Sequence, residues 1–161
     1  MKAKKIYEVL SFERGIDSKK SLSVGRRSQI EEWFRRWASD VDYEIDEDFN
    51  INVGGYLNLR GTSIKELPSG LNVGGYLDLR GTSIKELPSD LSVGGNLDLS
   101  GTSIKELPSG LSVGGYLNLS GTSIKELSSD LSVGGSLNLS ETSIKELPSD
   151  LSVAGTIYKD F

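Results

Sequence analysis

Hydrophobic residues recur with a fixed twenty-residue period over most of the chain. A unit of the form VGGYLNLRGTSIKELPSGLN occurs five times nearly unchanged, at Val53, Val73, Val93, Val113 and Val133, and a partial copy begins at Val153. A repeat of this length is typical of a solenoid, in which each coil buries its apolar side chains only by stacking on its neighbours. The pattern therefore predicts five full coils and a terminal fragment.

Within a unit, leucines alternate with polar residues over a short stretch. In the first unit Leu57 and Leu59 alternate with Tyr56, Asn58 and Arg60, which is the period of a strand with one buried face. Stacked units would align these strands, about 4.8 Å apart, into one parallel sheet. The proline that follows, with its Ser-Gly or Ser-Asp, leaves too few residues for a helix, so we expect an extended return segment or a single tight turn. The other interior positions of the first unit are Ile64, Leu67, Leu71 and Val73.

Two further repeated positions carry predictions about the backbone. Thr62 and its equivalents follow the strand, where a hydroxyl that both donates and accepts can satisfy unpaired backbone groups. The Gly54–Gly55 pair precedes the strand. We expect it to supply backbone conformations that other residues avoid.

The segment before the repeats predicts two helices and a strand. Apolar residues have helical spacing over residues 2–12 and again over residues 26–38, after a polar stretch containing Gly25. The second helix carries two tryptophans and a phenylalanine, and a solenoid exposes core at its ends, so we interpret this helix as a cap. A docking helix with exposed aromatic side chains is the alternative. Residues 41–51 alternate apolar and acidic side chains, which predicts a half-buried strand that could pair with the first coil.

Composition narrows the chemistry that the chain can perform. There is no cysteine and no histidine, which removes thiolate metal sites and the commonest general base, so we expect no catalytic residues, no metal site and no cofactor. A net charge of -5 argues against an extended phosphate-binding surface, and nucleic acid is not the expected partner. No apolar run has the length of a signal peptide or a membrane span, which favours a cytoplasmic protein that does not bind membranes.

The outward strand positions vary between units, whereas the interior positions and the Lys-Glu pair of each unit hardly change. Tyrosine and arginine, which dominate binding hot spots, gather in the first two units. This contrast predicts a face that binds a protein partner. The alternative is an aromatic ladder that only stabilises the sheet. The predicted partner-binding residues are Tyr56, Asn58, Arg60, Tyr76, Asp78, Arg80, Asn96, Asp98, Tyr116 and Asn118.

Asp78 and Asp98 occupy the same position in successive units, so they should lie on adjacent strands about 5 Å apart. Paired carboxylates at that distance invite comparison with a glycosidase or a cation site. Stacking brings any repeated residue together in this way, however, and Arg60 and Arg80 are close enough to neutralise the pair. We therefore regard catalysis by this pair as a hypothesis to be tested and not as the expected function.

The last residues begin another coil and then depart from its pattern. Ile157 stands at a leucine position, but Lys159 stands where a second inward leucine belongs, so the solenoid should stop there. An uncapped final strand is an open edge that can pair with a second copy of the chain. Tyr158 and Phe161 either fold over the core or form part of such a dimer contact.

The pattern L-x-L-x-x-T-x-I-x-x-L-P-x-x-L-x-V over residues 53–153 resembles the leucine-rich repeat family, with threonine where that family usually places asparagine. The resemblance implies an α+β repeat protein: an N-terminal helical cap over residues 1–52, then a short right-handed leucine-rich-repeat solenoid with one parallel β-sheet over residues 53–161. It also implies that the sheet face binds another macromolecule. The short return segment and the glycine pair depart from the family pattern, and a straighter parallel β-solenoid is the alternative architecture.

The N-terminal sequence IYEVLSFERGIDSKKSLSVG resembles the opening of small proteins encoded by tailed bacteriophages. This resemblance implies a phage or prophage source and a host protein, such as a defence component, as the target. The expected function is therefore a non-enzymatic inhibitor or modulator that binds a host protein in the bacterial cytoplasm. A structural or self-assembling protein is the alternative.

Overall fold

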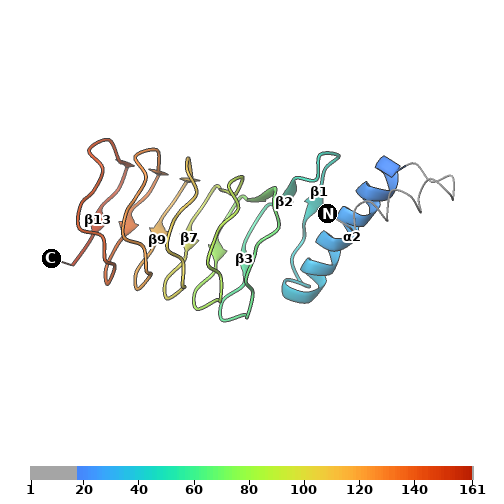
Figure 1. Cartoon of the computed structure of the whole chain (residues 1–161), viewed down its shortest axis with the longest axis horizontal. Helices are drawn as coiled ribbons and strands as arrows, with labels where there is room; N and C mark the ends of the chain where they lie inside the picture. The colour runs from blue at the N-terminus through green and yellow to red at the C-terminus, as the bar shows by residue number, and fades with distance from the viewer. Residues whose placement is uncertain (1–17, 161) are drawn as a thin grey trace.

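The computed structural model describes residues 18–160, so the helix expected over residues 2–12 lies outside the described part of the chain. One helix, α2 (Ser18–Trp37), is followed by a parallel β-solenoid of about 5 turns. Figure 1 shows the coils stacked side by side along the long axis of the molecule, from α2 at one end to β13 at the other. The predicted class, an N-terminal helix and a repeat solenoid with parallel strands, is confirmed.

Each coil contributes one short strand to each of two sheets. Sheet A has the order β1-β2-β4-β6-β8-β10-β12, and sheet B has the order β13-β11-β9-β7-β5-β3. The strands of sheet A are β1 (Glu44–Ile45), β2 (Ile51–Val53), β4 (Leu71–Val73), β6 (Ser92–Val93), β8 (Ser112–Val113), β10 (Ser132–Val133) and β12 (Ser152–Val153). The strands of sheet B are β3 (Leu57–Asn58), β5 (Leu77–Asp78), β7 (Leu97–Asp98), β9 (Leu117–Asn118), β11 (Leu137–Asn138) and β13 (Ile157–Tyr158).

The sequence predicts one parallel sheet, and the structure has two. The second sheet arises because Leu71, Asn72 and Val73 also alternate between buried and more exposed positions, as a half-buried strand does. Partners in both sheets are twenty residues apart, as in the pairs Leu71 with Ile51 and Leu77 with Leu57. The repeat period therefore sets the register of the whole molecule.

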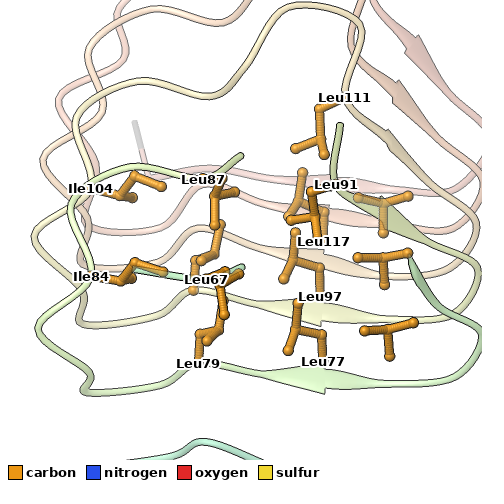
Figure 2. Close-up of a cluster of buried hydrophobic side chains, with 14 of the residues drawn as sticks. Leu67, Leu77, Leu79, Ile84, Leu87, Leu91, Leu97, Ile104, Leu111 and Leu117 are labelled. Carbon is orange, nitrogen blue, oxygen red and sulfur yellow. The ribbon is translucent and has the colours of Figure 1, made fainter. Parts of the chain in front are cut away.

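The core is a stack of similar apolar layers contributed by successive coils (Figure 2). Leu57 and Leu59 are fully buried, and Ile64, Leu71 and Val73 are at most 2% exposed. Full burial of a leucine or isoleucine side chain stabilises a fold by about 1.5–3 kcal/mol. Because each layer contacts the next, the stacked coils share one continuous hydrophobic core. The return segments contain no helix, and residues 69–70 and their equivalents form tight turns, as predicted.

The glycine pairs are needed for close approach of neighbouring coils and not for unusual backbone conformation. None of them has a positive φ. A Cβ atom added to Gly75 would lie 2.5 Å from the carbonyl oxygen of Gly55, and one added to Gly95 would lie 2.5 Å from that of Gly75. In the first coil Gly54 and Gly55 have open space at the corresponding place. The expectation of forbidden conformations was therefore wrong, and steric contact between stacked backbones explains the pair.

Helix α2 caps the N-terminal end of the core. Ile30 and Phe34 are 6% and 1% exposed, and both belong to the same hydrophobic cluster as the coils. The indole N–H of Trp33 donates to the carbonyl of Glu66 at 3.3 Å, which fixes the helix against the first coil. The helix begins at Ser18 and not at Arg26, and Gly25 lies inside it, where a Cβ would meet open space. A single glycine costs a helix only about 1 kcal/mol, which the flanking helix formers offset.

The strand expected over residues 41–51 is shorter than predicted and is divided by a turn. Strand β1 pairs antiparallel with β2, with Ile45 opposite Ile51. Between them the carboxylate of Asp46 accepts hydrogen bonds from the backbone N–H groups of Asp48 and Asn50, at 2.9 and 2.8 Å. These bonds satisfy the turn locally and hold the pKa of Asp46 below its ordinary value, with the side-chain bond from Asn50 as the largest cause. The predicted pairing with the solenoid is present, through β2.

Candidate partner-binding face

The outward side chains of sheet B form one surface that runs the length of the solenoid, and we call it the sheet B face. Its first column contains Tyr56, Tyr76, Asn96, Tyr116 and Ser136, its second Asn58, Asp78, Asp98, Asn118 and Asn138, and its third Arg60, Arg80, Ser100, Ser120 and Ser140. The ladder register places equivalent residues side by side, as Asp78 lies opposite both Asn58 and Asp98. All ten predicted partner-binding residues therefore lie on this face.

The second column has a structural role that the sequence analysis missed. In every full coil the side-chain Oδ1 of the Asn or Asp accepts the backbone N–H two residues later, at 2.9–3.1 Å. This bond closes the turn that follows the strand, and asparagine and aspartate are the residues that make it. The signal was present in the sequence, because only these two residue types occupy the position. Asn58, Asn118 and their equivalents are thus needed for the fold whatever they bind.

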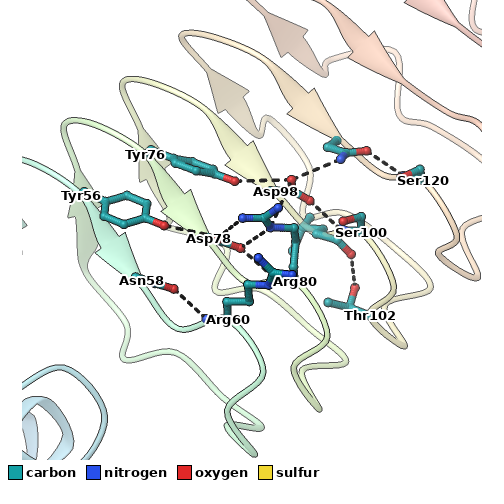
Figure 3. Close-up of polar contacts among 12 residues, drawn as sticks. Tyr56, Asn58, Arg60, Tyr76, Asp78, Arg80, Asp98, Ser100, Thr102 and Ser120 are labelled. Atoms are coloured by element: carbon teal, nitrogen blue, oxygen red, sulfur yellow. Dashed lines mark hydrogen bonds and ion pairs between the residues drawn. The ribbon is translucent and has the colours of Figure 1, made fainter.

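Asp78 is fully buried in the second column and is held by its neighbours (Figure 3). The guanidinium of Arg80 binds both of its carboxylate oxygens, with Nε 2.9 Å from Oδ1, and the hydroxyl of Tyr56 donates to Oδ2 at 3.3 Å. Burial alone would raise the pKa of Asp78, but the side-chain and backbone hydrogen bonds from Arg80 outweigh it and hold that pKa below its ordinary value. The same ion pair raises the pKa of Arg80.

Asp98 repeats this arrangement one coil further on. The hydroxyl of Tyr76 donates to its Oδ2 at 3.4 Å, and the amide of Asn118 donates to the same oxygen at 3.2 Å. Arg80 Nε lies 3.6 Å from that oxygen, so one guanidinium contacts both carboxylates. Burial, followed by the charges of Asp98 and Asp78, raises the pKa of Tyr76 to about 12, so its hydroxyl stays protonated and acts as a donor.

The two tyrosines of the first coils form a rigid pair. Their ring centroids are 5.1 Å apart, and each hydroxyl is anchored to the aspartate of the next coil. Tyr56 remains 47% exposed, and the side chain of Arg80 is 35% exposed. The guanidinium of Arg60 is exposed and makes no hydrogen bond to another described side chain. Aromatic, cationic and hydroxyl groups are therefore presented together at the N-terminal half of the face.

The other predicted residues of the face lie apart from this cluster. Asn96 is exposed and accepts the backbone N–H of Tyr116 through its Oδ1, at 2.8 Å. Tyr116 is half-buried beside it. No arginine is present in these later coils, and the third column is serine. The polar character of the face thus changes between the second and third coils.

Asp78 and Asp98 lie on neighbouring strands, as predicted, but their carboxylates face Arg80 and the tyrosine hydroxyls and are removed from water. A carboxylate already held by a guanidinium is a poor general base, because the ion pair stabilises its charged form. Within residues 18–160 no group of three or more acidic side chains is placed to hold a metal ion.

The structure also contains a hollow that the sequence did not predict. Beside the first coil lies a half-open hollow of about 440 Å³, lined by Asp40, Val41, Asp42, Val53, Gly55, Tyr56 and Asn58. It joins the turn after α2 to the outer edge of β3, and Tyr56 belongs both to it and to the sheet B face. No sequence signal marks this hollow, because its two sides are separated along the chain.

Within residues 18–160, no strand pairs with the C-terminal edge of either sheet. Strands β12 and β13 end their sheets, and Leu151, Val153 and Ile157 are only half-buried. Lys159 replaces the inward leucine and donates from Nζ to the carbonyl of Lys145 at 3.0 Å. Tyr158 takes the outward position of Asn138 and is 52% exposed, so it does not fold over the core. Phe161 lies outside the described residues.

Comparison with family models, with curated proteins and with solved structures finds no match for this chain. Within residues 18–160 no helix has the length and hydrophobicity required to cross a membrane.

Proposed function

We propose that this protein is a non-enzymatic binding module that recognises a protein partner through the sheet B face. The observation that carries the proposal is the Tyr56–Tyr76–Arg80 cluster, in which an exposed tyrosine, a half-buried tyrosine and a half-buried arginine are held by two buried aspartates. Side chains that are already ordered lose little conformational freedom on binding, so more of their contact energy appears as affinity. Tyrosine and arginine are also the residues that most often dominate interface energetics.

The finer form of the proposal rests on the sequence resemblances. A leucine-rich-repeat protein with a phage-like N-terminal segment would act on a host protein, and we propose a bacterial cytoplasmic protein, such as a defence component, as the partner. The expected effect on that partner is inhibition or modulation by occupation of its surface. Neither cofactor nor metal is needed for such a role.

The repeats supply a variant that removes the binding groups with little risk to the fold. The fifth coil carries Ser136, Asn138 and Ser140 at the three outward positions. The face variant Tyr56→Ser/Arg60→Ser/Tyr76→Ser/Asp78→Asn/Arg80→Ser/Asp98→Asn gives the first two coils the outward residues of the fifth, and it also neutralises buried Asp98, which would otherwise lose Arg80 and Tyr76 as partners. A matched control, Lys105→Ser/Lys125→Ser, changes two exposed residues outside the sheet B face.

The test is affinity capture from bacterial lysate followed by quantitative mass spectrometry. We expect the natural chain and the lysine control to recover the same protein in equal amounts. The face variant should recover at least about tenfold less of it, which corresponds to a loss of about 1.4 kcal/mol of binding energy. Circular dichroism confirms that all three chains are folded. Equal recovery by the face variant would contradict the proposal.

Self-assembly is the second candidate function, and the open C-terminal edge favours it. Unpaired strand groups beside half-buried apolar residues, with Leu147 37% and Tyr158 52% exposed, are a template for pairing with a second copy. Sedimentation velocity of the natural chain and of Tyr158→Lys distinguishes the two functions. A dimer that the lysine substitution dissociates would support assembly through this edge, whereas a monomer at all concentrations would dismiss it.

A further inference from the structure

In the part of the chain that the structure describes, strand β3 has an unpaired edge beside the hollow at the first coil. Within sheet B, β3 pairs with β5 and ends the sheet on that side. In the second coil the carbonyls of Tyr76, Asp78 and Arg80 accept hydrogen bonds from the first coil, at 2.8–2.9 Å, and the N–H of Gly75 donates to the Gly55 carbonyl at 3.0 Å. The first coil has no coil before it. The carbonyls of Tyr56, Asn58 and Arg60 and the N–H of Gly55 therefore have no hydrogen-bond partner among the described residues.

The unpaired groups of Gly55, Tyr56 and Asn58 belong to residues that line the hollow. All three residues are exposed. A Cβ atom added to Gly55 would meet nothing within 4 Å, so space is present directly beside the edge. An exposed strand edge with space beside it can accept an extended peptide as an additional strand, which binds through backbone hydrogen bonds.

The opposite wall of the hollow gives the edge a chemical preference. Asp40 and Asp42 line this wall and are exposed. The ion pairs in the described part of the chain all involve Arg80, so the carboxylates of Asp40 and Asp42 are not neutralised by a neighbouring side chain. Tyr56 lines the same hollow, and a cation beside an aromatic side chain and two carboxylates is stabilised by both. Arg60, the nearest outward cation of the first coil, is not part of the lining.

We propose that the edge of β3 binds an extended, basic segment of the partner protein, which adds as a strand and places a lysine or arginine between Tyr56 and the carboxylates of Asp40 and Asp42. The proposal rests on the proposed function, because it names the chemistry of the partner segment that reaches the N-terminal end of the sheet B face. A second copy of the chain is not the expected occupant. Stacking of a whole coil requires both sheet edges, and β1 already pairs with β2 in sheet A.

The probe for the test is a capped nine-residue peptide of alternating threonine and valine whose central threonine is replaced by lysine. A matched peptide carries glutamate at the centre. Two further versions of the lysine peptide are N-methylated at odd or at even residues, so that each loses the backbone donors of one of its edges. Binding to the full chain is followed by amide chemical shifts in two-dimensional NMR spectra.

We expect saturable binding of the lysine peptide, with the largest shift changes at residues 40–42 and 54–58. The glutamate peptide should bind at least about fivefold more weakly, a loss typical of two exposed ion pairs. Asp40→Asn/Asp42→Asn should reduce that difference, whereas the control Glu146→Gln/Asp150→Asn, at the other end of the solenoid, should leave it unchanged. One of the two N-methylated peptides should lose binding.

Three results would overturn the proposal: no saturable binding of the lysine peptide, equal binding of the lysine and glutamate peptides, or full binding of both N-methylated versions. Shift changes at residues 54–58 that appear on concentrating the chain without peptide would assign the edge to a second copy instead. A failed peptide test together with successful, face-dependent capture would remove this inference alone. Loss of face-dependent capture would remove the proposed function itself.

Discussion

At the scale of single residues, the repeats act as internal controls, because the same position is filled differently in successive coils. Aspartate and asparagine both close the turn after the strand, through the same bond to the backbone N–H two residues later. Only aspartate can also hold Arg80 by an ion pair. The charge at Asp78 therefore belongs to the tyrosine–arginine cluster, whereas its Oδ1 acceptor belongs to the fold.

Asp78→Asn should make the free energy of unfolding less dependent on pH in acid. The pKa of Asp78 lies below its ordinary value of 3.8 in the folded chain, so its ionised form stabilises the fold above about pH 4, and this contribution disappears as the pH falls through the lowered pKa. We expect a loss of about 1–2 kcal/mol at pH 7 and a smaller loss at pH 2.5. Urea unfolding at both pH values measures it. A loss equal at the two pH values would contradict this account of Asp78.

Four of the repeated threonines donate their hydroxyl to the carbonyl three residues earlier in the same coil, and among the described residues these hydroxyls do not bond to a neighbouring coil. Thr102 donates through Oγ1 to the carbonyl of Leu99 at 2.7 Å, whereas the buried hydroxyl of Thr82 has no partner within the described residues. Thr102→Val should therefore lower the free energy of unfolding by about 1 kcal/mol, and Thr82→Val should leave it unchanged or raise it. Paired urea titrations compare the two variants. Equal losses would show that both hydroxyls are bonded in solution.

At the scale of secondary-structure elements, the distance between stacked backbones decides which glycines are required. The second glycine of the pair is present in all six copies, while Ala154 replaces the first glycine in the last copy. A side chain at Gly95 would clash with the carbonyl of Gly75 in the preceding coil, whereas a side chain at Gly55 would meet no atom within 4 Å.

Gly95→Ala should therefore destabilise the fold by about 1–3 kcal/mol through overpacking, and Gly55→Ala should change the free energy of unfolding by less than about 0.5 kcal/mol. Thermal and urea unfolding of the two single variants measure the difference. Similar stability of both variants would mean that neighbouring coils can separate at no cost, against the close stacking described above.

The elements that the sequence predicted best are those set by the repeat period. Burial of Leu57 and Leu59, the register of twenty residues and the extended return segments all follow from a pattern repeated five times. The features that the sequence did not predict depend on contacts between segments. The second sheet needs the packing of coil on coil, and the early start of α2 at Ser18 depends on a helix that continues through Gly25.

At the scale of the whole molecule, the two ends of the solenoid differ. Among residues 18–160, α2 and β1 cap the N-terminal end in sheet A, whereas no described strand pairs with the outer edges of β3, β12 and β13. The sequence predicted that the residues of the candidate site share one face of the solenoid. Their network could not be predicted, because it depends on how far the tyrosine and arginine side chains reach into the next coil. The hollow with Asp40 and Asp42 depends on where the helix cap lies.

The central claim is that the tyrosine–arginine cluster binds a partner and does not merely stabilise the sheet. The most direct test measures partner recovery and the free energy of unfolding together in the natural chain, the face variant and the lysine control. We predict that the face variant loses at least about tenfold in recovery while its free energy of unfolding falls by no more than about 2 kcal/mol, because Arg80 is replaced together with both of the buried aspartates that it contacts. Undiminished recovery, with stability as the only property that falls, would contradict the claim and leave the cluster a structural ladder.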